Sequence, residues 1–156
     1  MSGPEREPSP CVVWRFTDGK PGHDNQSAGL AEALERLGPT DVRVVNAAAS
    51  AGGSRDVSLL PPPTLLVGAG RSTHRPLLRA RAHHGGKAVV LMRPGPPADE
   101  YDLCVIPAHD KPVETPNVFV TEGALNRVQQ ASPKAQNTGL ILLGGPSKHH
   151  DWLDRE

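Results

Sequence analysis

Aromatic side chains are scarce in this sequence of 156 residues, which contains two tryptophans, two phenylalanines and one tyrosine. So few rings cannot form the row of stacking platforms on which proteins hold single-stranded nucleic acid. An excess of positive charge is also missing, because 17 Lys and Arg residues balance 17 Asp and Glu residues. Domains dedicated to nucleic acid are usually basic, so we expect no nucleic-acid partner.

Cysteine is nearly absent, and the two that occur, Cys11 and Cys104, lie in or beside apolar runs. We expect both to be buried free thiols of a reducing compartment, and no Cys–His spacing resembles a zinc site. No apolar run approaches the roughly 18 residues of a membrane-spanning helix. Residues 1–10 are polar and proline-rich, which predicts a disordered tail and not a signal peptide. The expected location is the cytoplasm, with a peripheral contact to the inner membrane left open.

Glycine and proline are abundant, and they cluster at expected turns between short apolar runs. The most distinctive turn is residues 17–26 (TDGKPGHDNQ), which follow an apolar run at 11–16 and precede a helical pattern at 27–37. This order predicts a strand, a glycine-rich loop and a helix beginning near residues 25–27. In open α/β sheets, ligands bind at such strand ends.

The side chains of this loop suggest acid–base and anion chemistry. Lys20 could supply a positive charge, and His23 or Asp18 could act as acid or base. The spacing fits neither the phosphate-binding Walker A loop nor the dinucleotide fingerprint. The plain alternative is a solvated turn in which Asp24 or Asn25 caps the following helix.

Further apolar runs predict strands at 41–46, 64–67, 88–92, 101–106 and 117–120, with a second helix at 75–84. Polar residues follow several of these strands, among them Arg71, His74 and His109. Because parallel strands end at one edge of a sheet, such residues outline a crevice there. The alternative without a ligand is that Ser72 or Thr73 caps the second helix and that the Arg71 side chain is solvated.

Two other kinds of site are not favoured. Gly68-x-Gly70 is half of a dinucleotide motif, but the strand at 88–92 is not followed by the acidic residue that holds a ribose. His74, His83 and His84 could be metal ligands, but adjacent side chains on a helix point in different directions. We therefore expect no metal and no resident cofactor.

The predicted fold class is α/β, a Rossmann-like open parallel sheet with flanking helices, over residues 11–131. Residues 132–138 are expected to be a linker. Residues 139–156 resemble the first strand and glycine-rich loop of a second domain that is truncated. An uncovered apolar strand at 139–143 could pair with a second copy of the chain.

Several motifs together resemble the mitochondrial-fission "elongated mitochondria" family of plant and bacterial proteins. That family joins a plant mitochondrial fission factor to bacterial homologues classed as glycosyltransferases, some linked to the lipopolysaccharide outer core, and formerly named nucleoside-diphosphate-sugar epimerases. The motifs occur in the family's order, at residues 17–26 (TDGKPGHDNQ), 68–74 (GAGRSTH), 90–92 (VLM), 107–110 (PAHD), 121–126 (TEGALN) and 144–148 (GGPSK).

The resemblance implies a glycosyltransferase-B-like architecture, in which the first domain holds the acceptor and the second binds the nucleotide-sugar donor. This chain resembles the first half. The side chains that would face the cleft are Asp18, Lys20, His23, Gln26, Arg71 and His74, with His109 as a further ligand-binding candidate. The donor-phosphate site would begin at Gly144, Gly145, Ser147 and Lys148. Family members are considerably longer than this chain, which puts catalysis by the chain alone in question.

Two functions remain open from the sequence. The first is metal-independent sugar transfer from a nucleotide-sugar donor to a cell-envelope glycan such as lipopolysaccharide core. His23 is the favoured base, because an unperturbed imidazole titrates near neutral pH. The second is a non-catalytic binding or adaptor protein related to the mitochondrial fission factor.

Overall fold

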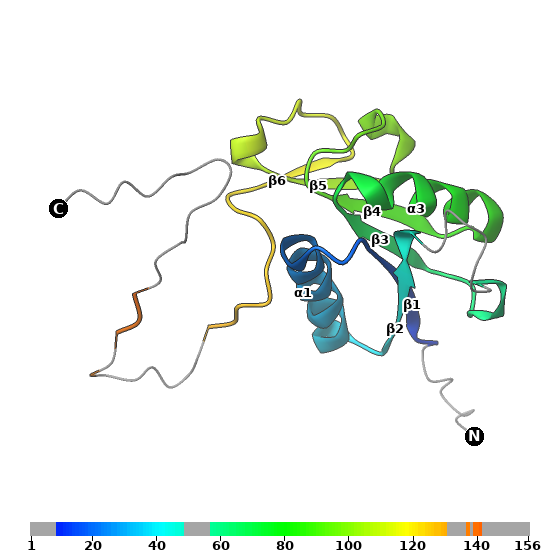
Figure 1. The fold of residues 1–156 in the computed structure, drawn as a ribbon, viewed down its shortest axis with the longest axis horizontal. Helices are drawn as coiled ribbons and strands as arrows, with labels where there is room; N and C mark the ends of the chain where they lie inside the picture. Colours follow the sequence, from blue (N-terminus) through cyan, green and yellow to red (C-terminus); the bar gives the residue numbers. More distant parts are fainter. Residues whose placement is uncertain (1–8, 49–56, 131–136, 138, 142–156) are drawn as a thin grey trace, which may run out of the picture.

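A computed structural model describes residues 9–48, 57–130, 137 and 139–141 of the chain. In order, its helices and strands are β1 (Cys11–Thr17), α1 (Pro21–Leu37), β2 (Thr40–Asn46), β3 (Leu65–Ala69), α3 (Arg71–His84), β4 (Lys87–Leu91), β5 (Leu103–Pro107) and β6 (Val118–Thr121). An α-helix follows β1 and another follows β3, whereas β4, β5 and β6 are joined without a longer helix (Figure 1). Short 3₁₀ turns occur at Val57–Leu59, Ala98–Glu100 and Ala108–Asp110.

The strands form one six-stranded sheet in the order β2-β1-β3-β4-β5-β6, and every neighbouring pair is parallel. The predicted open α/β sheet is therefore confirmed. The chain begins at β1, next to the edge of the sheet, forms the edge strand β2, and then crosses back to β3 on the other side of β1. The direction of winding thus reverses between β1 and β3.

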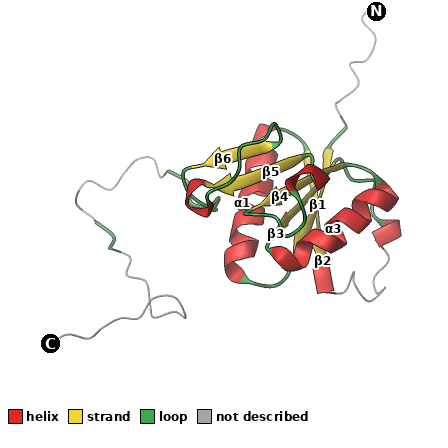
Figure 2. Cartoon of the chain, turned by 90° about the horizontal axis from the view of Figure 1, so that it is seen from above, coloured by secondary structure: helices red, strands yellow, loops and turns green. Residues whose placement is uncertain are grey.

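The two faces of the sheet are covered by different helices (Figure 2). Trp14 and Phe16 of β1 pack with Leu77 of α3 on one face. Val13 points to the opposite face, where Leu30 of α1 packs against the sheet. Successive side chains of a strand alternate between faces, so β1 carries apolar side chains on both faces. This explains why its sequence reads as an apolar run that only Arg15 interrupts.

Both helices begin earlier than the sequence pattern predicts. Helix α1 begins at Pro21, not near residues 25–27, because a proline in the first turn is already fixed at a helical φ and lacks only an N–H that the helix does not use. Helix α3 begins at Arg71, not at residue 75. The connection after β1 is therefore three residues, 18–20, and His23 stands on a helix.

Two further expectations are corrected. The predicted strand at 101–106 begins at residue 103, and the Asp102 carboxylate just before it accepts a hydrogen bond from the Ala88 N–H at 2.8 Å. Cys11 is only half-buried, because it stands at the exposed start of β1, whereas Cys104 is buried as expected.

Several expectations concern residues that are sparsely described or not described. Residues 139–141 belong to neither helix nor strand, while 142 and 143 and the donor-phosphate residues lie outside the described part. Residues 1–8 and most of the predicted linker also lie outside it. Within the described residues, no helix has the length and apolar character needed to cross a membrane.

The segment after β6, residues 122–130, returns across the helix α1. Leu125 joins the apolar cluster on that face. The Arg127 guanidinium lies 2.6 Å from the Glu32 carboxylate. A Cβ atom built on Gly29 would stand 2.4 Å from the backbone oxygen of Asn126. The absence of a side chain at Gly29 is therefore what lets this segment lie against the helix.

We predict opposite effects for two glycine-to-alanine substitutions in α1. Gly29→Ala should lower the free energy of unfolding by about 1–3 kcal/mol, because the new methyl group collides with backbone. Gly22→Ala meets nothing within 4 Å and should be neutral or stabilise by up to about 1 kcal/mol, since alanine favours helix. Urea unfolding of both variants tests this. Equal stabilisation by both would show that residues 122–130 do not pack on α1.

Candidate functional site

The candidate site lies where the carboxyl ends of β1 and β3 meet. The chain leaves β1 toward α1 on one face and leaves β3 toward α3 on the other. The two connections therefore diverge and leave a crevice, which is the usual ligand position in open α/β sheets. Asp18 follows β1, His23 stands in the first turns of α1, and Ser72 stands in the first turn of α3.

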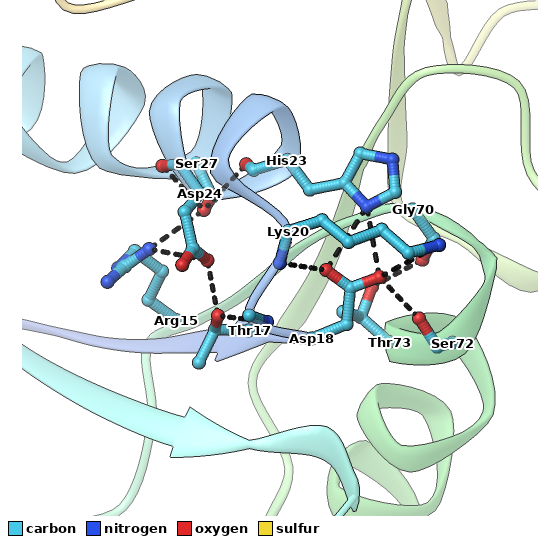
Figure 3. A network of polar contacts seen from close by, with 11 residues as sticks. Arg15, Thr17, Asp18, Lys20, His23, Asp24, Ser27, Gly70, Ser72 and Thr73 are labelled. Atoms are coloured by element: carbon cyan, nitrogen blue, oxygen red, sulfur yellow. Dashed lines mark hydrogen bonds and ion pairs between the residues drawn. The ribbon is translucent and has the colours of Figure 1, made fainter. Parts of the chain in front are cut away.

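The Asp18 carboxylate is the centre of this site (Figure 3). Its side chain is 6% exposed. The Ser72 hydroxyl donates to it at 2.6 Å, the His23 Nδ1 lies 3.0 Å from Oδ2, and the Lys20 backbone N–H donates at 3.2 Å. The Lys20 ammonium is 3.9 Å away and largely exposed. Three elements of the chain thus converge on one carboxyl group.

These contacts keep Asp18 ionised. Burial alone would raise the pKa of this carboxyl, but hydrogen bonds from Ser72, His23 and the Lys20 backbone, together with the charge of His23, lower it below its ordinary value. An ionised carboxylate can only accept hydrogen bonds. The His23 nitrogen that faces it, Nδ1, must therefore carry the proton.

In the neutral form of His23, the other ring nitrogen, Nε2, is therefore the acceptor. In the described residues, Nε2 has no hydrogen-bond partner, and the side chain is 21% exposed. This is the arrangement of a general base whose tautomer is fixed by a carboxylate behind it. Asp18 itself is enclosed by donors, so the geometry places it as the orienting group and His23 as the group that faces solvent.

The ring of His23 rests directly on Gly70, the residue before α3. A Cβ atom at Gly70 would stand 2.2 Å from the His23 Nδ1, so any side chain there would displace the imidazole. Gly70 also has a φ of +86°, a left-handed conformation that other residues rarely adopt. Both facts make glycine necessary at this position.

Ser72 does not form a hydrolase triad with His23. Its hydroxyl donates to Asp18 and not to the imidazole, whereas a serine nucleophile needs the histidine as its base. Neither Ser72 nor Thr73 caps α3 through its side chain, since the Thr73 hydroxyl donates to the Gly70 carbonyl at 2.8 Å. The capping alternative is therefore wrong at both positions.

A second polar network fixes the first turns of α1 to β1 (Figure 3). The Arg15 guanidinium donates to the Ser27 hydroxyl at 3.0 Å and lies 3.5 Å from the Asp24 carboxylate. The Thr17 hydroxyl donates to the same carboxylate. Asp24 therefore ties the helix to the strand, and the helix has no side-chain N-cap from it or from Asn25.

The other predicted site residues differ in their exposure and in how close they lie to the site. Lys20 and Arg71 are exposed beside it, while Gln26 is buried within α1. His109 follows β5, two strands away from β3, and is 3.7 Å from Asp110. The donor-phosphate residues Gly144, Gly145, Ser147 and Lys148 lie outside the described part.

His74 lies in the interior beneath the site, with 1% of its surface exposed. Its Nδ1 accepts a hydrogen bond from the Gly95 N–H at 3.1 Å, and its ring packs on Tyr101 at a centroid distance of 5.9 Å. Burial, with smaller contributions from the charges of Arg71 and His23, lowers its pKa to about 4. His74 is therefore neutral and positions the connection after β4.

The roles of two residues of the site are not predicted from the sequence. Ser72 is expected as a helix cap and Gly70 as half of a dinucleotide motif, and both belong to the family motif at residues 68–74. The signal for both was their position directly after the apolar run of β3, next to the strand whose end carries Asp18. Among the described residues, no three His, Cys, Asp or Glu side chains gather in a geometry that could hold a metal ion.

Comparison with known proteins gives one result. The family model described as "Mitochondrial fission ELM1" matches residues 21–156 of the chain. The matched region includes α1 with His23 and α3 with Ser72, and it begins just after Asp18. No curated protein and no solved structure matches the chain.

We predict that His74 makes stability depend on pH. Its folded-state pKa of about 4 lies below its ordinary value of 6.5, so the unfolded chain binds a proton that the folded protein rejects. Stability should be full above about pH 6.5 and fall by about 3 kcal/mol as the pH drops to about 4. Urea midpoints between pH 4 and 7 measure this.

The matched variants are His74→Asn and His109→Gln. The first can keep an acceptor for the Gly95 N–H but cannot titrate, so the slope over this pH range should flatten. The second removes an exposed imidazole and should retain the slope. An unchanged slope in His74→Asn would assign the pH dependence to other groups.

We also predict that Gly70→Ala displaces the His23 ring. The comparison variant is Gly85→Ala, because Gly85 has a similar positive φ of +76° but nothing within 4 Å of its added Cβ. Both should lose about 1–2 kcal/mol from the left-handed backbone. Only Gly70→Ala should change the His23 imidazole signals in ¹⁵N and ¹H NMR spectra. Identical His23 spectra in both variants would contradict the packing on Gly70.

Proposed function

Because this chain belongs to the mitochondrial fission ELM1 family, we propose that it is the acceptor-binding half of a metal-independent glycosyltransferase. The single observation that carries the proposal is the Asp18–His23 pair at the switch point of the sheet. It supplies a general base with a fixed tautomer at the position where α/β proteins bind ligands.

The proposed step begins with a hydroxyl group of the acceptor donating a hydrogen bond to the His23 Nε2. As the hydroxyl oxygen bonds to the anomeric carbon of the donor sugar, its proton moves to Nε2. The bond from that carbon to the nucleoside diphosphate breaks, and the diphosphate leaves with the electron pair. The Asp18 carboxylate stabilises the imidazolium that forms, as buried carboxylates do in other His-dependent enzymes.

The surrounding residues support this role by holding Asp18 in place. The Ser72 hydroxyl and the Lys20 backbone N–H fill the carboxylate's remaining acceptor positions. The leaving diphosphate needs separate donors, and we assign these to Gly144, Gly145, Ser147 and Lys148. Backbone N–H groups and an ammonium suit that task, and they require no divalent ion. The proposed acceptor is a cell-envelope glycan such as lipopolysaccharide core, reached from the cytoplasm at the inner membrane.

We predict that His23→Gln abolishes most transfer in the natural full-length gene product. With radiolabelled UDP-, GDP- and ADP-sugars and an envelope glycan fraction, transfer should fall by about 10²–10⁴-fold, the usual contribution of a general base. Asp18→Asn should also lower turnover, because an amide can donate to Nδ1 and so favour the wrong tautomer.

The matched control is His83→Gln, which removes an exposed imidazole on α3 outside the site. It should transfer at the wild-type rate. Transfer by His23→Gln at the wild-type rate would remove His23 as the base. Absence of transfer from every donor in the wild type would favour the non-catalytic adaptor that the sequence left open.

A further inference from the structure

Three arginines form a row along one face of α3. They are Arg71, Arg75 and Arg79, here called the arginine row, and all three are exposed. Their spacing of four residues places them on the same side of the helix, about 6 Å apart at the backbone. The row begins next to Ser72, whose hydroxyl contacts Asp18.

Among the described residues, the three side chains of the arginine row have no acidic partner, and neither do those of Arg36 and Arg93. Across the described ranges, Arg15, Arg43, Arg81 and Arg127 each pair with a carboxylate. Between residues 9–48, 57–130, 137 and 139–141, the side chains of Arg71, Arg75 and Arg79 form no ion pair and no hydrogen bond with one another or with other residues. Three guanidinium groups with their hydrogen-bond donors therefore face solvent side by side.

This arrangement works against the stability of the helix. Helix α3 has no acidic residue in its first turn, and its sequence (RSTHRPLLRARAHH) contains no acid at all. Like charges four residues apart repel each other, and positive charge is unfavourable at the N-terminal end of a helix. A cluster that costs stability and has no acidic partner in the described part of the chain is better explained by a ligand.

The arginine row also lines the cavities around the site. One cavity, of about 780 Å³, is lined by all three arginines with Gly95, Pro96, Pro97 and Glu100 on its other wall. A second, of about 540 Å³, joins Arg75 and Arg79 to Asp18 and Lys20. Glu100 adds one carboxylate and makes no ion pair with a described arginine, while Asp18 is enclosed by its donors. The net charge facing these cavities is positive.

We propose that the arginine row binds phosphomonoester groups carried by the acceptor. The assignment to the acceptor rests on the proposed function, whereas the binding of phosphate does not. Guanidinium groups bind phosphate oxygens through paired, charge-assisted hydrogen bonds, which a neutral saccharide does not offer. A row about 12 Å long can engage two phosphates at once. When bound there, the phosphates hold the acceptor with its hydroxyl group next to the His23 Nε2.

The test measures binding of glucose 1,6-bisphosphate, glucose 6-phosphate and glucose by isothermal titration calorimetry at 50 and 200 mM salt. Wild-type protein should bind the bisphosphate best, the monophosphate more weakly and glucose not detectably, and salt should weaken the binding. The triple variant Arg71→Gln, Arg75→Gln, Arg79→Gln should lose about tenfold or more in affinity for the bisphosphate. Its melting temperature should stay equal or rise, because repulsion in α3 is relieved.

The control is a second triple variant, Arg36→Gln, Arg43→Gln, Arg127→Gln, which removes the same charge elsewhere. It should keep the wild-type affinity within about twofold, since only distant charges change. Equal losses in both triple variants would show an effect of net charge and overturn the proposal. So would bisphosphate binding that survives loss of the arginine row, or equal binding of glucose and its bisphosphate.

A second measurement, with lipid vesicles, distinguishes a phosphate on a lipid-anchored acceptor from a phosphate on a free saccharide. Sedimentation with phosphatidic acid vesicles, against phosphatidylcholine vesicles, should require the arginine row if the acceptor is anchored in lipid. Binding to the soluble sugar phosphates alone identifies a free phosphorylated saccharide. Binding of glucose 1,6-bisphosphate by a wild-type protein that transfers sugar from none of the donors would reject the proposed function and leave the phosphate site standing.

Discussion

A carboxylate that is 6% exposed needs hydrogen-bond donors within the protein, because its transfer out of water is costly. Asp18 receives them from the Lys20 backbone N–H in the turn after β1, from His23 on α1 and from Ser72 on α3. One buried charge therefore fixes the relative positions of two helices that lie on opposite faces of the sheet. Without it, the ends of β1 and β3 would present separate loops. With it, they present one imidazole in a defined tautomer.

The other features of the site provide the space and the helix position that the contact between His23 and Asp18 requires. The His23 ring reaches Asp18 by crossing the start of α3, and Gly70 leaves room for it there. Pro21 starts α1 directly after a three-residue turn, so His23 falls on the first turns of the helix and not on a loop. A side chain on a helix has fewer orientations than one on a loop, and this favours a preorganised base. Asp24, bound by Arg15 and Thr17, holds the same turns on β1.

The sequence predicts the fold better than it predicts the site. Short apolar runs of β-branched residues between glycine- and proline-rich turns are sufficient to indicate a parallel sheet, and the six-stranded sheet confirms that prediction. The sequence pattern places the starts of α1 and α3 too late in the chain, because the apolar residues of each helix begin only in its second turn. The helices themselves begin at Pro21 and Arg71. His23 and Asp18 were selected by their chemistry. Ser72 and Gly70 were not, because their roles depend on the order β1-β3 in the sheet, which no local pattern reveals.

The buried face and the exposed face of α3 have opposite effects on the stability of the helix. Its buried side must be apolar and uncharged, and even His74, placed there, has its pKa lowered to about 4 by burial and by the charges of Arg71 and His23. Its exposed side carries three guanidinium groups that have no acidic partner among the residues described, and their mutual repulsion lowers the stability of the helix. Packing of Leu77 and Ala80 against the sheet supplies the stability that offsets this repulsion. The helix is thus held by its buried face, which leaves the composition of its exposed face free to serve a ligand.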